Sequence, residues 1–267
     1  PLAGTAVLLT VSMALRGYAA GHLPLSNGYE TMIFVSWCLS LLALGIGRRF
    51  PIAAASGLLM SGFALLVASL GMANPQITPL VPVLRSPWLS LHVSLIMASY
   101  ALLGLLMLNG TAALALAAAA RAGTAERTSR TLARLRLFGR LLLYPAVFLL
   151  TAGIFTGAVW ANASWGRYWG WDPKEVWALI TLIVYALPLH EQSLARFRRP
   201  LFFHAYTLWA FAAVLMTYFG VNYLLGGMHS YGGGFRPGYA AATVFAAVTA
   251  FALLTVAALI RQRRTDA

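Results

Sequence analysis

Long apolar runs separated by short polar segments dominate the chain. They cover roughly residues 2–20, 29–47, 51–72, 90–117, 141–160, 174–190, 201–224 and 239–260. At 1.5 Å per residue each can cross a hydrocarbon layer of about 30 Å as a helix, although the run at 174–190 is barely long enough. The runs lack the period-two alternation of membrane-spanning strands. The pattern predicts an all-α protein, a polytopic membrane helix bundle of about eight transmembrane helices.

Basic residues follow every second apolar run. They are Arg48, Arg49, Arg121, Arg127, Arg130, Arg134, Arg136, Arg140, Arg196, Arg198, Arg199, Arg261, Arg263 and Arg264. The opposite loops carry only Arg85, Arg167, Lys174 and Arg236. Because short cytoplasmic loops are enriched in Lys and Arg, both termini are predicted to be cytoplasmic. The segments at 21–30, 74–90, 165–177 and 226–238 then lie on the outer face.

Two charged features within this topology need an interpretation. We interpret the segment 121–140 as a solvated basic connector, in preference to an amphipathic helix on the membrane surface. Arg16 is the one clear charge inside an apolar run. It is either a functional intramembrane charge or a side chain near the inner end that snorkels or is ion-paired.

Composition agrees with a membrane protein. Hydrophobic residues make up 60% of the chain and charged residues 9%, with a mean hydropathy of +0.77, whereas about 25% of a soluble domain is charged. No polar stretch is long enough for a soluble core, so residues 1–267 are predicted to be a single integral-membrane domain. Topology accounts for the net charge of +13, so nucleic acid is not an expected partner. Cys38 is the one cysteine, which excludes a disulfide framework or thiolate cluster.

The stretch "WGRYWGWDPKEVW" (165–177) concentrates four tryptophans and the only lysine. An interfacial aromatic belt explains one or two of these tryptophans. Asp172 can cap a helix that starts at Pro173, with Glu175 in its first turn. These residues either only start the helix or also contact a ligand. The residues that offer a flat aromatic surface are Trp165, Trp169 and Trp171.

Three of the five histidines share the outer face with this stretch. The topology places His22 and His229 on outer loops, His92 at the outer end of a span, and His190 and His204 at inner ends. Imidazole is a common ligand for iron, zinc and copper. Asp172 and Glu175 leave a metal hydrolase open, but flat aromatic surface suits a large planar ligand. Because two histidines suit the axial positions of haem iron, haem is favoured.

Several motifs resemble one known family. "WGRYWGWDPKEVWALITLIVYALPLH" resembles the tryptophan-rich WWD signature of haem-handling proteins. "GHLPLSNGYETMIFVSW" (21–37), "LHVSLIMASYALL" (91–103) and "NYLLGGMHSYG" (222–232) are similar, in order, to motifs of the CcsA/ResC family of cytochrome c biogenesis proteins, the system II route. The agreement covers most of the chain.

The resemblance implies that haem b is held on the outer face by His92 and His229 as axial ligands, over a WWD segment at about 160–177. His190 matches the family's membrane-embedded histidine, whose second ligand comes from a CcsB/ResB-like partner. His204 is an alternative second ligand for that inner haem, although it matches no family ligand, and His22 takes a structural or gating role. The haem-contacting set thus implied is His92, His229, His190, Trp165, Trp169, Trp171, Asp172, Lys174 and Glu175.

The implied function is haem transport, haem presentation and covalent attachment of haem to CxxCH motifs of apocytochrome c. The chain would be a subunit of a CcsBA-type cytochrome c synthase and, in that complex, an enzyme that forms thioether bonds. The resemblance places it, among membrane lipids, in a bacterial plasma (inner) membrane or a thylakoid membrane. The chain has no CxxCH of its own and so is not a c-type cytochrome.

Three other functions are weighed against this one. A CcmC-like haem exporter or chaperone would pass haem to another carrier without ligation, but such proteins are shorter. A secondary transporter would show repeat symmetry, discontinuous helices and charges near mid-membrane. A quinone-linked haem b subunit would carry two histidine pairs on facing helices in mid-membrane.

Overall fold

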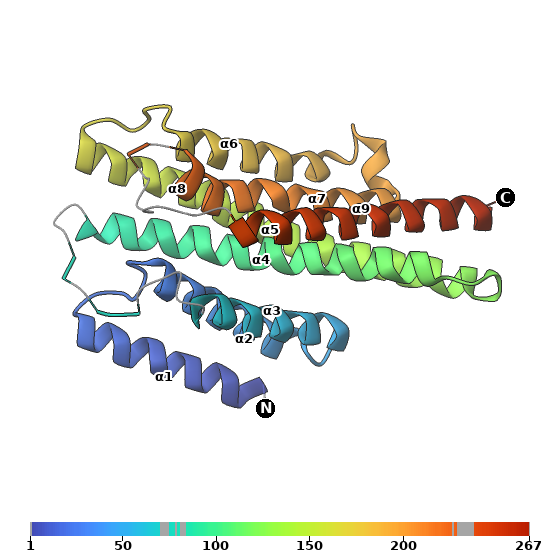
Figure 1. Ribbon diagram of the computed structural model, residues 1–267, viewed down its shortest axis with the longest axis horizontal. Helices are drawn as coiled ribbons and strands as arrows, with labels where there is room; N and C mark the ends of the chain where they lie inside the picture. Colours follow the sequence, from blue (N-terminus) through green and yellow to red (C-terminus); the bar gives the residue numbers. More distant parts are fainter. Residues whose placement is uncertain are drawn as a thin grey trace. The chain divides into compact units, whose positions relative to one another are not determined.

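The computed structural model describes residues 2–69, 75–77, 79–80, 84–225, 227–228 and 238–266, and this part of the chain is helical without a strand. The helices are α1 (Leu2–Ala20), α2 (Gly28–Ile46), α3 (Pro51–Ser69), α4 (Pro87–Ala119), α5 (Ala125–Trp165), α6 (Pro173–Ala186), α7 (Pro200–Leu215), α8 (Val221–Leu224) and α9 (Gly238–Asp266) (Figure 1). Six helices in the described part are long and apolar enough to cross a membrane by themselves. The prediction of an all-α, polytopic membrane bundle is confirmed.

The eight predicted spans correspond to helices with some changes at their ends. The sixth combines α6 with the 3₁₀ helix Leu187–His190, and the seventh runs from α7 through a π-helical turn, Met216–Gly220, into α8. The largest difference is α5, which has 41 residues. The predicted solvated connector at 121–140 is instead mostly helix, continuous with the span, because Ala, Leu and Arg favour helix and no proline precedes Pro145 within α5.

The chain divides into two compact units, each built from two stretches of sequence. Unit 1 contains Pro1–Leu105 and Pro145–Gly170, and unit 2 contains Leu106–Tyr144 and Trp171–Ala267. Helices α4 and α5 contribute to both units. The division describes internal contacts only and does not test the single domain predicted for residues 1–267. That domain stays a prediction.

Unit 1 is held together by packing and by hydrogen bonds between helices. Ser36 on α2 and Ser61 on α3 share a buried hydrogen bond at 2.7 Å. The Trp37 indole N–H on α2 donates to Thr10 on α1 at 2.8 Å. The Ser99 hydroxyl on α4 donates to the carbonyl of Ala146 on α5 at 2.8 Å. Such polar bonds stabilise helix pairs in lipid, where apolar burial alone favours no particular partner.

Unit 2 packs α7 against α6 and the ends of other helices. Thr181 on α6 and Thr217 share a buried hydrogen bond at 2.9 Å, and the Tyr206 hydroxyl on α7 donates to the Val184 carbonyl at 2.8 Å. One apolar core cluster joins α4, α7 and α9, with buried members Leu114, Ala117, Leu201, Leu208 and Ala258.

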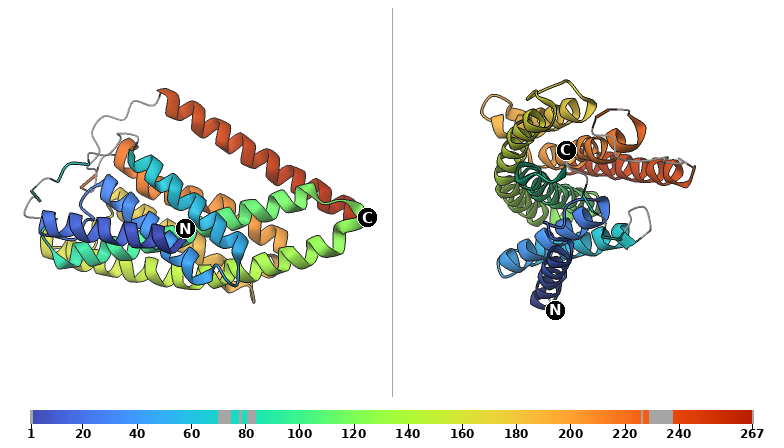
Figure 2. Two further views of the ribbon diagram at one scale, coloured as in Figure 1. Left: turned by 90° about the horizontal axis from the view of Figure 1, so that it is seen from below. Right: turned by 90° about the vertical axis from the view of Figure 1, so that its left-hand side faces the viewer.

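Contacts between loops agree with the prediction that successive loops lie on alternating sides of the membrane. At one end of unit 2, α9 ends near the loop between α4 and α5 (Figure 2). The Arg261 side chain of α9 donates there to the Ala120 carbonyl. At that end Arg136 also pairs with Glu191. All four residues lie in or next to segments predicted to be cytoplasmic. Elsewhere in unit 2, Asp172 contacts Met228, and both segments are predicted to face outward.

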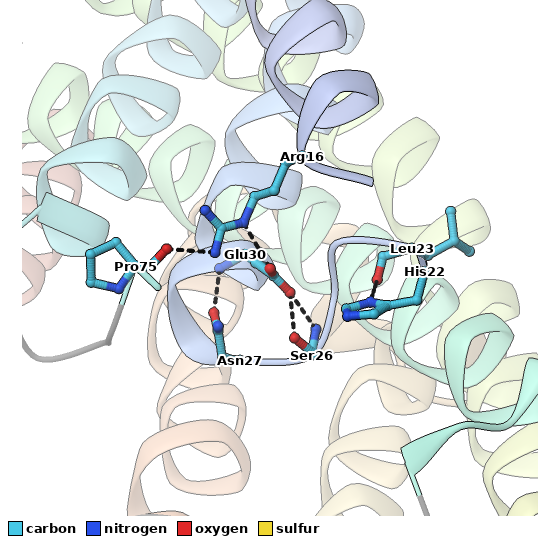
Figure 3. Close-up of polar contacts among 7 residues, drawn as sticks. All are labelled: Arg16, His22, Leu23, Ser26, Asn27, Glu30 and Pro75. Carbon is cyan, nitrogen blue, oxygen red and sulfur yellow. Dashed lines mark hydrogen bonds and ion pairs between the residues drawn. The ribbon is translucent and has the colours of Figure 1, made fainter. Parts of the chain in front are cut away.

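Arg16 is ion-paired, which is one of the alternatives predicted for it from the sequence. Its Nε lies 2.7 Å from Glu30 Oε1, and a terminal nitrogen donates to the Pro75 carbonyl at 2.7 Å (Figure 3). Glu30 is also held by the backbone N–H and hydroxyl of Ser26, at 2.8 and 2.6 Å. Because Arg16 lies one turn before the end of α1, next to the predicted outer segment 21–30, the alternative position near the inner end is wrong for this topology.

Candidate functional site

His92 on α4 is held in one tautomer by a backbone carbonyl. Its Nδ1 lies 2.6 Å from the carbonyl oxygen of Gly153 on α5, within unit 1. A carbonyl oxygen can only accept, so Nδ1 carries the proton and Nε2 carries the lone pair. Histidines that ligate metals commonly donate their second nitrogen to a carbonyl in this way. In this tautomer Nε2 is the nitrogen able to ligate a metal, and ligation by His92 stays a prediction.

Two glycines on α5 allow the imidazole to sit this close. A Cβ at Gly157 would lie 2.6 Å from His92 Nδ1, and one at Gly153 would lie 2.7 Å from the Cδ1 of Ile96, one turn further along α4. Either contact is closer than a carbon atom can approach without displacing its neighbour. These glycines were not among the predicted site residues; their four-residue spacing in an apolar helix is the signal that could have revealed them.

The first half of the tryptophan-rich stretch belongs to unit 1. Trp160, only 2% exposed, packs edge-on against Trp165 with ring centroids 4.7 Å apart. Trp169 is half-buried. Gly166 adopts a φ of +73°, and a Cβ at Gly170 would lie 2.8 Å from the Arg167 guanidinium carbon. Trp165 is thus packed against Trp160, which was not among the tryptophans predicted to form the flat aromatic surface.

Trp171, in unit 2, combines a strained backbone with an exposed indole. Its φ is +56°, the one positive φ of a non-glycine residue in the described part of the chain, and its side chain is 71% exposed. A bulky residue in the left-handed region costs on the order of 1–3 kcal/mol, and such strain concentrates at functional sites. Packing does not explain why an exposed tryptophan adopts this conformation. Among the residues of the predicted aromatic surface, Trp171 is therefore the strongest candidate for a functional role.

Asp172, Pro173 and Glu175 start α6 as predicted. The backbone N–H of Lys174 donates to Asp172 Oδ1 at 3.0 Å, and the backbone N–H of Asp172 donates to Glu175 Oε2 at 3.1 Å. This is a reciprocal capping box with Pro173 in the first helical turn. The structural role of these residues is confirmed, and contact with a ligand stays a prediction.

Asp172 also has a long-range role that the sequence did not reveal. Its second oxygen, Oδ2, accepts the backbone N–H of Met228 at 2.7 Å. A Cβ at the preceding Gly227 would lie 2.5 Å from the same oxygen, so only glycine fits there without a shift. The next residue in the chain, His229, lies outside the described residues. The start of α6 therefore holds the segment that leads directly to a predicted haem ligand.

Lys174 reinforces this connection. Its Nζ donates to Asn222 Oδ1 at 2.9 Å, and the Asn222 amide donates in turn to the Tyr218 carbonyl at 2.6 Å. The lysine is half-buried. Asp172 and Lys174, on either side of the helix-starting proline of the tryptophan-rich motif, thus bind Met228 and Asn222 respectively.

His190 in unit 2 repeats the arrangement seen at His92. It ends the 3₁₀ helix Leu187–His190, is exposed, and its Nδ1 lies 2.9 Å from the Ala186 carbonyl oxygen. Nδ1 must therefore carry the proton, which leaves Nε2 as the nitrogen able to ligate metal.

His204 and His22 are the other two histidines in the described part of the chain. His204 is 0% exposed; its Nε2 lies 3.3 Å from the Leu132 carbonyl oxygen and its Nδ1 has no hydrogen-bond partner. Helix packing encloses it, so it could not act as a substitute haem ligand without repacking. The Nδ1 of His22 lies 2.9 Å from the Leu23 carbonyl oxygen, and its buried Nε2 has no hydrogen-bond partner (Figure 3).

The predicted site residues are thus distributed between two separately described units. His92, Trp165 and Trp169 belong to unit 1, and His190, Trp171, Asp172, Lys174 and Glu175 belong to unit 2. The pairing of His92 with His229 stays a prediction. Within the described ranges, no group of three or more His, Cys, Asp or Glu side chains is arranged to hold a metal ion.

The fold defines a polytopic helical membrane protein, in which two histidines each place Nδ1 against a backbone carbonyl. A family model described as cytochrome C assembly protein matches residues 25–229. The chain belongs to this family.

Named relatives cover most of the chain. It is 43% identical over 227 residues to protein NrfI of Wolinella succinogenes, an alignment that covers 85% of this chain and 25% of NrfI. It is 37% identical over 265 residues to the cytochrome c biogenesis protein CcsA of Synechococcus sp. strain WH7803, covering 85% and 82%. It is 36% identical over 237 residues to CcsA of Chlamydomonas reinhardtii, covering 85% and 65%. The chain therefore spans about a quarter of the length of NrfI.

Proposed function

We propose that this protein presents haem on the outer face of a membrane for covalent attachment to apocytochrome c, as a subunit of a CcsBA-type synthase. The observation that carries the proposal is the hydrogen bond between His92 Nδ1 and the Gly153 carbonyl, which favours the tautomer whose Nε2 would be the nitrogen that ligates iron. Membership of the cytochrome c assembly family and similarity to proteins named CcsA support it.

The outer site consists of His92 and His229 on opposite faces of the haem iron, with Trp165, Trp169 and Trp171 as aromatic surface for the ring. The hydrogen bond from Met228 to Asp172 supports this arrangement, since it holds the residue that precedes His229. Two imidazoles keep other ligands from the iron and leave the vinyl edge of the haem for the apocytochrome.

Covalent attachment needs no further oxidant or reductant. Each cysteine S–H of the CxxCH peptide adds across one vinyl double bond: the C=C π bond and the S–H bond break, and C–S and C–H bonds form. The peptide's own histidine then replaces one of the two imidazoles, which favours release of the product. The protein contributes position and protection of the iron, whereas the organic chemistry belongs to haem and thiol.

The inner site is built around His190, with its second ligand from a CcsB/ResB-like partner. The hydrogen bond from His190 Nδ1 to the Ala186 carbonyl supports ligation through Nε2. Haem collected here is transferred to the outer site, in a bacterial plasma membrane or a thylakoid membrane.

The test is the visible spectrum of the protein purified with its partner. His92→Ala and His229→Ala should each abolish the spectrum of bis-imidazole haem at the outer site and stop maturation of a c-type reporter. Unchanged Soret and α bands together with normal maturation would show that the ligand assignment is wrong.

A second arm separates a synthase from a CcmC-like exporter. The chain and its partner are expressed in a host that lacks its own assembly pathway. Covalent haem on a CxxCH reporter is expected of a synthase, and haem binding without thioether formation is expected of an exporter.

A further inference from the structure

Three charged side chains meet beside His190 within unit 2. Glu191, the next residue, contacts Arg136 of α5 through Oε2, and its Oε1 lies 2.6 Å from a terminal nitrogen of Arg140, one turn further along α5. The three side chains are largely enclosed, with exposed fractions of 17% for Arg136, 28% for Arg140 and 16% for Glu191. Two positive charges therefore share a single carboxylate.

Both arginines have further contacts that hold them without Glu191. The Nε of Arg136 donates to the Phe197 carbonyl at 3.0 Å, and its guanidinium lies over the Phe203 ring, 5.8 Å from the centroid. Arg140 donates to the Tyr144 hydroxyl at 2.7 Å and lies 5.7 Å from that ring's centroid. The two guanidiniums are thus preorganised as a pair.

Glu191 is the easier member to displace. It lies in the turn at 191–193 between the 3₁₀ helix and the next helical turn, whereas both arginines are on the long helix α5. Arg198 donates to the backbone carbonyls of Glu191 and Gln192, each at 3.0 Å, so the turn keeps its own support if the Glu191 side chain leaves.

This geometry points to a carboxylate-binding site: Arg136 and Arg140 bind a propionate of the haem held by His190, and Glu191 occupies the site until haem arrives. Planar guanidiniums bind carboxylates with paired, charge-assisted hydrogen bonds, and Glu191 already bridges the two arginines in the way that a ligand carboxylate would. The inference rests on the proposed inner haem site and adds the residues that recognise the acidic edge of the ring.

The test compares haem with haem dimethyl ester, in which both propionates are blocked. Each ligand is titrated into the complex with its partner in nanodiscs and followed by the Soret shift. The complex carries His92→Ala, so that the inner site dominates the signal. We expect haem to bind about tenfold more tightly than the ester, the factor that corresponds to one charge-assisted hydrogen bond of about 1.4 kcal/mol.

Arg140→Gln is the decisive variant, since the described contacts of this side chain are only with Glu191 and Tyr144 of its own helix. It should bring the affinities for haem and ester together while the imidazole-ligated spectrum persists. Glu191→Gln should strengthen haem binding, because the competing carboxylate is lost. Arg130→Gln is the matched control, an exposed arginine of the same helix paired with exposed Glu126, and should change nothing.

The outcomes separate the inference from the proposed function. If Arg140→Gln and Arg136→Lys both keep the preference for haem over the ester, the carboxylate site is wrong. If His190→Ala leaves haem loading intact, the inner haem site itself is wrong, whatever the arginine variants do.

Discussion

Asp172 and Met228, 56 positions apart in sequence, are joined by a hydrogen bond of 2.7 Å from the Met228 backbone N–H to Asp172 Oδ2. The other carboxylate oxygen of Asp172 caps α6 at the same time. One side chain thereby links the aspartate of the WWD motif to the residue before His229, so the two motifs depend on each other physically as well as by family resemblance.

Asp172→Asn separates these two roles. Asparagine caps helices as well as aspartate does, so α6 should persist, but its NH₂ group would face either the Lys174 or the Met228 N–H. One buried donor is then left without an acceptor, at a cost of about 1–3 kcal/mol. We expect unchanged helicity by circular dichroism together with a weakened outer-site haem spectrum. Glu126→Gln, the same carboxylate-to-amide change at an exposed position of α5, serves as the control; equal loss in both variants would contradict a specific role for the Met228 bond.

Gly157→Ala should disturb haem ligation by His92 without removing a single polar group. The new Cβ would lie 2.6 Å from His92 Nδ1 and force the imidazole away from the Gly153 carbonyl. The expected result is a shifted or weakened Soret band and a lower yield of c-type reporter. Gly62→Ala in α3 is the matched control, because no atom lies within 4 Å of its Cβ position. A normal spectrum in Gly157→Ala would mean that the bond to Gly153 does not orient the ligand.

Trp171→Asn should raise stability and lower function. Asparagine tolerates the left-handed conformation that Trp171 adopts at φ +56°, so relief of strain should stabilise the folded state by about 1 kcal/mol. Loss of the exposed indole should weaken haem retention at the outer site. Thermal unfolding in detergent and haem content per protein measure the two effects, and a variant that is no more stable would show that the conformation carries no strain.

Glu30→Ala should severely reduce folded protein. It leaves Arg16, which also lies over the Tyr29 ring at 5.0 Å, as an unpaired charge in a largely enclosed position. Breaking a buried ion pair costs about 3–5 kcal/mol, whereas replacing both partners by apolar residues is often tolerated. Glu30→Leu combined with Arg16→Leu should therefore recover much of the yield, as judged by the amount of monodisperse protein. A double variant no better than Glu30→Ala would indicate that the charges themselves are required.

The helices could be predicted from the sequence because they depend on local composition. Apolar run length located helices at all eight predicted spans, and six helices in the described part are long and apolar enough to cross a membrane by themselves. The arginine distribution grouped loop ends that the contacts from Arg261 to Ala120 and from Asp172 to Met228 bring together. The helix start at Asp172 was equally local, since the capping residues lie within four positions.

Long-range side-chain contacts could not be predicted in this way. Nothing near Asp172 in sequence indicates that its second oxygen holds Met228, and nothing near His92 indicates that Gly157 must lack a Cβ. The helix within 121–140 was missed for another reason. The positive charge of this segment was interpreted as the sign of a solvated connector, although arginine is a good helix former. Hydropathy indicates how readily a residue can be buried, but it does not indicate which neighbouring residue that side chain will contact.

The arginines of α5 would set the depth at which the proposed inner site receives haem. Arg136 and Arg140 precede Pro145 and lie at the end of unit 2 where segments predicted to be cytoplasmic come together. In the predicted topology this end meets the lipid headgroups of the inner leaflet. A haem arriving at His190 would then keep its acidic edge at the water boundary while its apolar ring enters the acyl chains, so uptake would require no ionised group to leave the headgroup layer.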